Sequence, residues 1–90
     1  AIEGALDLLA AKAGVDALEI RLRNALREGD RTTTGQRLAG GVGLVRTLEA
    51  VRPRYEEARR QGKPVGLACA IKNSGIGNGA AEAGRARLVV

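Results

Sequence analysis

Apolar side chains recur at helical spacing over the first two thirds of the chain and alternate with small residues nearer its end. The first helical stretch spans residues 2–13, where four apolar side chains share one face: Ile2, Leu6, Leu9 and Ala13. Gly14 follows at the position where a left-handed residue commonly ends a helix. The pattern therefore predicts a helix over residues 2–13 that turns one apolar face toward a core.

A second helix is predicted over residues 17–27. Asp16 stands where an N-cap residue accepts backbone N–H bonds, and Glu19 follows three residues later, as in a capping box. The apolar stripe of this helix consists of Leu18, Leu22, Ala25 and Leu26. We expect Gly29 to end it.

A third helix is predicted over residues 43–61, after a stretch at 30–41 that lacks apolar periodicity. Its stripe consists of Leu44, Leu48, Val51 and Tyr55. Pro53 falls inside this pattern, and proline removes one helical hydrogen bond and clashes with the preceding turn. We therefore expect a kink or a restart at Pro53.

The apolar period changes to two after Pro64, with bulky side chains at Val65, Leu67, Cys69 and Ile71. This alternation predicts a strand over residues 65–72. Residues 85–90 predict a second strand, and a glycine-rich loop joins the two. The sequence thus predicts a single α+β module over residues 1–90, with three helices followed by two strands.

Composition excludes several kinds of site. The 90 residues carry a net charge of +5, no histidine and one cysteine. Ser-His-Asp and Cys-His catalysis, histidine metal ligation, an internal disulfide and a cysteine-type zinc site are therefore excluded. No apolar run approaches the roughly 18 residues of a membrane span, and Glu3 and Asp7 argue against a signal peptide. Cys69 fits a reducing compartment, so a cytoplasmic location is expected.

The glycine-rich loop is the strongest candidate for a functional segment. It reads Gly75-Ile76-Gly77-Asn78-Gly79, which follows a predicted strand but lacks the GxGxxG spacing of a dinucleotide loop. The next predicted strand also begins too soon for a crossover helix. The glycines would instead let the backbone approach another group closely, at the edge of a pocket.

Other candidates offer less chemistry. Residues 40–43 lead into a predicted helix N-terminus that could hold an anion, but they lack a Walker lysine. Residues 32–34 supply threonine hydroxyls without an evident activating base. Of four carboxylates that could be paired for acid–base work, Asp16 and Glu19 are better suited to capping, and Glu28 and Asp30 flank a helix end. The sequence therefore predicts no catalytic, cofactor-binding or metal-binding residue.

Two runs of this chain resemble the large subunit of the molybdenum hydroxylases, which include xanthine dehydrogenase, aldehyde oxidase and aerobic carbon monoxide dehydrogenase. Residues 16–26 read DALEIRLRNAL, similar to the family's DPLELRLRN with Ala17 in place of proline. Residues 28–36 read EGDRTTTGQ, similar to its EGDxTxTGQ. Weaker similarity extends through Ile2, Glu3 and Asp7 upstream and through residues 66–77 downstream.

The resemblance implies an excised part of a larger molybdopterin-binding domain. Its parent would hydroxylate aldehydes or N-heterocycles, using molybdopterin together with iron–sulfur clusters and FAD on partner domains or subunits. The cofactor motifs and the catalytic glutamate of the family would lie outside these residues, so the fragment would be scaffold and inactive alone. The resemblance also implies a substrate-channel loop formed by Asn73, Ser74, Gly75, Ile76, Gly77, Asn78 and Gly79. This loop lacks the purine-clamping aromatic of xanthine dehydrogenase, so a purine is not favoured.

An alternative function is a small basic interaction module that binds a protein partner or nucleic acid through arginines. The dispersed charge and the single aromatic residue weigh against it, and no specific nucleic acid or membrane partner is expected. The expected partners are the remaining parts of the molybdenum-binding subunit. A homodimer through the exposed edges of the two predicted strands is also expected, because an isolated two-stranded sheet is marginal.

Overall fold

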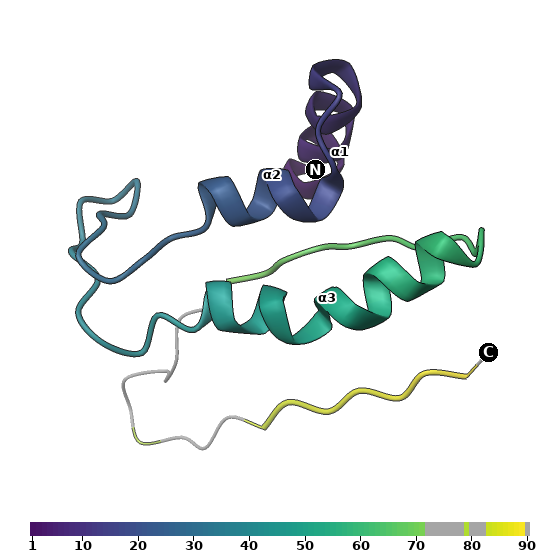
Figure 1. The fold of residues 1–90 in the computed structure, drawn as a ribbon. Coiled ribbons are helices and arrows are strands. Elements are labelled where there is room, and N and C mark those ends of the chain that lie inside the picture. Colours follow the sequence, from purple (N-terminus) through teal and green to yellow (C-terminus); the bar gives the residue numbers. More distant parts are fainter. Residues whose placement is uncertain (72–78, 80–82, 90) are drawn as a thin grey trace.

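A computed structural model describes residues 1–71, 79 and 83–89. Its elements are three α-helices: α1 (Ile2–Ala13), α2 (Ala17–Asn24) and α3 (Leu44–Arg60). Helix α2 packs against both of the others, so it is the centre of the arrangement (Figure 1). No helix of the described part of the chain is long and apolar enough to cross a membrane.

The junction between α1 and α2 forms as the sequence predicts. Gly14 adopts the left-handed conformation (φ 64°, ψ 28°), and its N–H lies near the carbonyls that end α1. The Asp16 carboxylate then accepts N–H bonds from Leu18 (2.8 Å) and Glu19 (3.3 Å), which confirms it as the N-cap of α2. The end of α1 and the start of α2 are therefore fixed within three residues.

Helix α2 ends at Asn24, three residues before the predicted end at residue 27. Ala25 leaves the helix in an extended conformation, and the Arg27 guanidinium donates to the carbonyls of Leu22 (3.1 Å) and Ala25 (2.9 Å). An arginine side chain thus satisfies acceptors that a further helical turn would have used. The sequence pattern favoured the longer helix because Leu26 continues the apolar stripe.

Helix α3 runs unbroken through Pro53, so the expected restart is wrong. Arg52 forms ion pairs with Glu49 (2.7 Å) and Glu56 (3.5 Å), which join the turns on either side of the proline. Leu48 and Tyr55 are buried before and after it. Side-chain pairing and burial on both sides outweigh the one hydrogen bond that proline cannot donate.

The core lies between α2 and α3. Its buried members are Leu18, Leu22, Ala25, Leu48 and Tyr55, with Leu44, Val45, Leu67 and Cys69 packed around them. The prediction that the Ile2–Leu9 face of α1 turns toward a core is largely wrong. Ile2 is 79% exposed and Leu9 is 54% exposed, whereas Ala10 is buried. Among the helices α1 packs against α2 alone, so most of its circumference faces outward.

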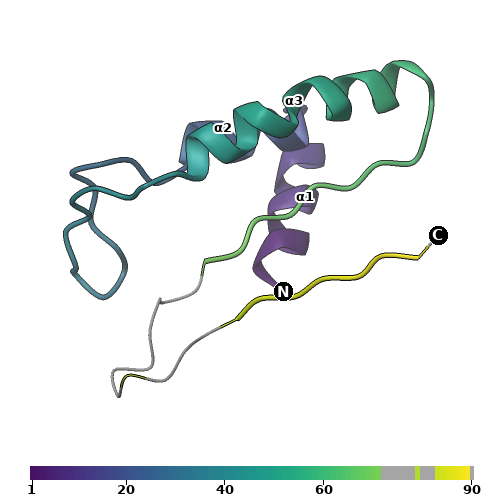
Figure 2. The same ribbon diagram turned by 90° about the horizontal axis from the view of Figure 1, so that it is seen from below.

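The predicted α+β class is wrong, because the described residues form helices and no strand or sheet. Residues 65–71 run back along α3 as an extended segment without secondary structure (Figures 1 and 2). Residues 83–89 are exposed. Alternating apolar residues favour a strand only when another strand accepts and donates backbone hydrogen bonds. Here the Cys69 N–H donates instead to the Glu3 carboxylate (2.9 Å). Residues 72 and 90, the last of each predicted strand, lie outside the described part.

Replacing Leu18 by alanine should lower the free energy of unfolding by about 2–5 kcal/mol, because it leaves a cavity in the core between α2 and α3. Leu18 is 2% exposed, whereas Leu8 on α1 is 71% exposed. Leu8→Ala is the matched control and should change the free energy by less than about 0.5 kcal/mol. Urea unfolding followed by far-ultraviolet circular dichroism measures both. Equal losses would contradict a core centred on α2.

Candidate functional site

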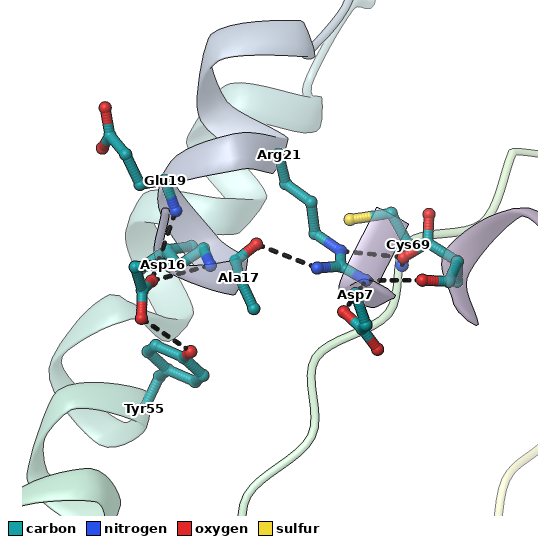
Figure 3. A network of polar contacts seen from close by, with 9 residues as sticks. Asp7, Asp16, Ala17, Glu19, Arg21, Tyr55 and Cys69 are labelled. Carbon is teal, nitrogen blue, oxygen red and sulfur yellow. Dashed lines mark hydrogen bonds and ion pairs between the residues drawn. The ribbon is translucent and has the colours of Figure 1, made fainter. Parts of the chain in front are cut away.

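Two polar clusters lie at the N-terminal part of α2 (Figure 3). The Arg21 cluster consists of Arg21, Glu3, Asp7 and the backbone N–H of Cys69. The Asp16 cluster consists of Asp16, Tyr55 and Arg59. Together they join α1, α2, α3 and the segment 65–71 by polar contacts.

Among the residues that the structure describes, Arg21 is the buried charged side chain, with 4% of its surface exposed. Its Nε lies 2.8 Å from Glu3 Oε2, and its Nη2 lies 2.9 Å from Asp7 Oδ1. Its Nη1 donates to the Ala17 carbonyl at 2.9 Å. A buried guanidinium is tolerated only when such partners replace water, and here both α1 carboxylates do so.

Glu3 accepts a second hydrogen bond at the oxygen that already faces Arg21. The donor is the Cys69 N–H, at 2.9 Å. This bond, followed by the one from Arg21, lowers the pKa of the Glu3 carboxyl. For Arg21, burial alone would lower the pKa, but its hydrogen bonds to Glu3 and Asp7 outweigh burial and raise it. Burial and the nearby Glu3 charge raise the pKa of the Cys69 thiol, so the thiol is favoured over the thiolate.

Asp16 uses its two oxygens for different elements. Oδ1 caps α2, while Oδ2 accepts from the Tyr55 hydroxyl at 3.1 Å and pairs with Arg59. The Arg59 guanidinium carbon also lies 5.7 Å from the centre of the Tyr55 ring. One carboxylate therefore holds α3 against the start of α2.

Residues 28–36 form a closed turn that holds itself together. Thr32 donates its N–H to the Gln36 carbonyl (2.9 Å), and Arg31 and Arg37 form an isolated antiparallel bridge. The Asp30 carboxylate accepts from the Arg27 N–H (2.7 Å), so it has a local structural partner. The hydroxyls of Thr32 and Thr34 lie 2.9 Å apart and contact no base.

The four candidate carboxylates do not form one site. Asp16 and Glu19 lie at the start of α2, and Glu19 pairs with the exposed Arg23 at 2.7 Å. Glu28 and Asp30 lie beyond the other end of α2, where Glu28 accepts from the Gly40 N–H at 3.3 Å. The expectation that these groups serve capping and local structure rather than acid–base chemistry fits these contacts.

An apolar groove of about 500 Å³ lies between the start of α3 and the segment 65–71. The glycines at 40–43 are at its edge, and its lining side chains include Leu26, Leu38, Val42, Leu44, Val51, Leu67 and Ile71. Such a wall has no charged side chain to hold the phosphate or the polar ring of a pterin cofactor. In the described part of the chain, no three cysteine or carboxylate side chains gather as metal ligands. The lining of this groove therefore offers a molybdopterin no charged side chain.

The predicted substrate-channel loop is outside the described residues from Asn73 to Asn78. Gly79, its last member, is described; it is exposed and has a positive φ of 77°. The assignment of this loop rests on the resemblance alone.

Sequence reasoning missed the Arg21 cluster. Arg21 follows Leu18 by three residues and precedes Ala25 by four, so it belongs to the face that carries the apolar stripe. A charged residue at such a position needs a buried partner, and that is the signal that would have found the cluster. Its carboxylate partners, Glu3 and Asp7, lie 18 and 14 residues before it on another helix, which sequence spacing does not show.

Three curated proteins are similar to this chain over a small part of their own length. An aldehyde oxidoreductase of Megalodesulfovibrio gigas is 37% identical over 79 residues, which is 88% of this chain and 9% of the relative. A xanthine dehydrogenase molybdenum-binding subunit of Escherichia coli O157:H7 is 37% identical over 101 aligned positions, which cover the whole chain and 13% of the relative. The chain is homologous to part of the molybdenum hydroxylase large subunit. This confirms the resemblance seen in residues 16–26 and 28–36.

The homology is confined to a small share of each relative. A nicotinate dehydrogenase large molybdopterin subunit of Eubacterium barkeri is 42% identical over 55 residues, or 61% of this chain and 13% of that subunit. The chain thus spans about a tenth of the length of the molybdenum hydroxylase relatives it matches. No family model matches the chain, and no solved structure matches it.

The Glu3 carboxylate should make the stability of the fold depend on acid pH. Its pKa is lowered from 4.5 in the folded state, so its contribution is complete above about pH 4.5 and is lost as the pH falls through the folded pKa. Glu3→Gln should flatten the fall in unfolding free energy below about pH 4.5. Glu19→Gln, which removes a more exposed carboxylate, is the control. Urea unfolding across this pH range tests the effect, and an unchanged slope in Glu3→Gln would contradict it.

Proposed function

We propose that this chain is part of a molybdopterin-dependent oxidoreductase that hydroxylates a carbon centre of an aldehyde or an N-heterocycle, with water as the oxygen source. The observation that carries the proposal is the 37% identity to a molybdenum-binding subunit across the whole chain. The named relatives act as an aldehyde oxidoreductase, a nicotinate dehydrogenase and a xanthine dehydrogenase. The first name indicates an aldehyde as substrate, and the other two indicate N-heterocycles.

The role of these 90 residues within the parent is structural. Asp16 caps a helix, Glu3, Asp7 and Arg21 pair between helices, and the groove is apolar. The residues of the proposed substrate-channel loop, Asn73 to Gly79, are the part that would approach substrate. Molybdopterin would be held by other parts of the subunit, which agrees with the lack of a cluster of metal-ligating side chains among the described residues.

The partners follow from the same proposal. The remaining parts of the molybdenum-binding subunit would cover the exposed apolar residues Ile2, Leu8, Ile71, Leu88 and Val89. Iron–sulfur clusters and FAD would be held by other domains or subunits, since one cysteine cannot ligate a cluster. The free Cys69 thiol supports a cytoplasmic location.

The alternative of a basic interaction module has no support. Several arginines that gave the chain its positive charge are committed to carboxylates: Arg21, Arg23, Arg52, Arg59 and Arg60. The matches to molybdenum-enzyme subunits account for the sequence without a nucleic-acid partner.

Metal analysis tests the proposed function. The complete subunit encoded around this sequence should carry about one molybdenum per chain and reduce a dye with aldehyde or N-heterocycle as electron donor. The 90-residue chain, expressed in the same cells, is the control and should contain neither molybdenum nor pterin. A complete subunit without molybdenum would overturn the proposal, and stoichiometric molybdenum in the short chain would overturn the structural role.

Self-association tests the proposed exposed surface. Because Ile71, Leu88 and Val89 lie open in the isolated chain, a second copy should cover part of them as the protein concentration rises. Static light scattering should then show a mass that increases toward that of a dimer. Leu88→Lys should weaken this association, while Lys12→Ala on α1 should leave it unchanged. A monomer at millimolar concentration would contradict it.

A further inference from the structure

The segment 65–71 is held by fewer directional contacts than the helices. Within the described part of the chain its one hydrogen bond to a helix runs from the Cys69 N–H to Glu3 Oε2, at 2.9 Å. Leu67 and Cys69 also pack against the core. The segment therefore depends on two different kinds of contact, one polar and one apolar.

Apolar packing alone does not fix where the segment lies along α3. Side chains at alternate positions share a face, and bulky ones occur at Val65, Leu67, Cys69 and Ile71. A shift by two residues would again present apolar side chains to the core, so burial would change little. A directional contact is needed to select one position.

The backbone at the end of α3 fixes where the segment 65–71 begins. The Lys63 N–H donates to the Ala58 carbonyl at 3.0 Å, and Gly62 has a φ of 67°. The six residue-to-residue steps from Lys63 to Cys69 span roughly 20 Å when extended, at about 3.3 Å per step. The fixed start limits how far Cys69 can reach, and its hydrogen bond to Glu3 is the directional contact within that reach.

We propose that Glu3 and Arg21 form a polar latch that sets the position of residues 65–71 and so forms one wall of the apolar groove. Arg21 orients the Glu3 carboxylate through Nε at 2.8 Å, and the same oxygen accepts from the Cys69 N–H. Figure 3 shows Arg21 beside Cys69 and Asp7. Asp7 pairs with Arg21 at 2.9 Å, whereas among the described residues the acceptor of the Cys69 N–H is Glu3. Release of the latch would free the segment and open the groove while leaving the α2–α3 core in place. The inference concerns the fold of this chain and does not depend on the proposed oxidoreductase activity.

Amide hydrogen exchange in the 90-residue chain tests the latch. Glu3→Ala should raise the exchange rate of the Cys69 amide at least about tenfold, because that N–H loses a charged acceptor. The Leu48 amide in α3 should stay within about threefold of its original rate. The matched control is Asp7→Ala, which removes a carboxylate from the same guanidinium and should leave the Cys69 amide nearly unchanged.

The outcomes separate a latch from general stabilisation. A selective rise at Cys69 in Glu3→Ala supports the latch. No rise, or an equal rise at Cys69 and Leu48, overturns it, as does an equal rise at Cys69 in Asp7→Ala. If Glu3→Ala unfolds, Glu3→Gln keeps an acceptor oxygen without the charge and should give a smaller, still selective rise. Reaction of the Cys69 thiol with an aromatic disulfide reagent gives an independent reading, and its rate should rise in the same order.

Discussion

The buried guanidinium of Arg21 is the constraint on which the arrangement of α1 and the segment 65–71 depends. A charge that is 4% exposed must find its hydrogen-bond acceptors inside the protein. It finds them on α1, at Glu3 and Asp7, and at the first residue of its own helix, Ala17. The apolar contacts of α1 are few, since Ile2 and Leu9 face outward. Polar pairing thus contributes to the placement of α1 where hydrophobic burial is small.

The apolar core and the Asp16 cluster have the complementary role. Leu18 and Leu22 pack on Leu48 and Tyr55, which supplies the non-directional attraction between α2 and α3. The Asp16 carboxylate then gives this attraction a direction, because it caps α2 and also accepts from the Tyr55 hydroxyl. In both clusters a carboxylate that satisfies a local need also reaches an element far along the chain.

Local features of the fold could be predicted from the sequence. Three helices were expected near their observed positions, and Gly14 and Asp16 were correctly placed at the junction of α1 and α2, because caps depend on a few neighbouring residues. Features that depend on distant residues could not. The end of α2 depends on where the Arg27 side chain turns, and the face of α1 that is buried depends on Arg21.

The two strands show the same limit more strongly. Residues 65–71 have the alternation of a strand, but alternation describes side chains, and a strand is defined by backbone partners. In the described part of this chain the backbone partner of Cys69 is a carboxylate. Of the candidate site, Asp16 was found as a cap, whereas Arg21 and Glu3 were not recognised as a pair, and residues 73–78 lie outside the described part.

The runs that carry the resemblance to the molybdenum hydroxylases have structural roles in this chain. Residues 16–26 supply a cap, core leucines and the buried arginine, and residues 28–36 form a turn that is closed by its own backbone. The similarity to the family therefore includes residues that build the fold of this chain. The Glu3–Arg21 pair joins α1 to α2, and the same Glu3 oxygen accepts from the Cys69 N–H, so one carboxylate connects three parts of the chain.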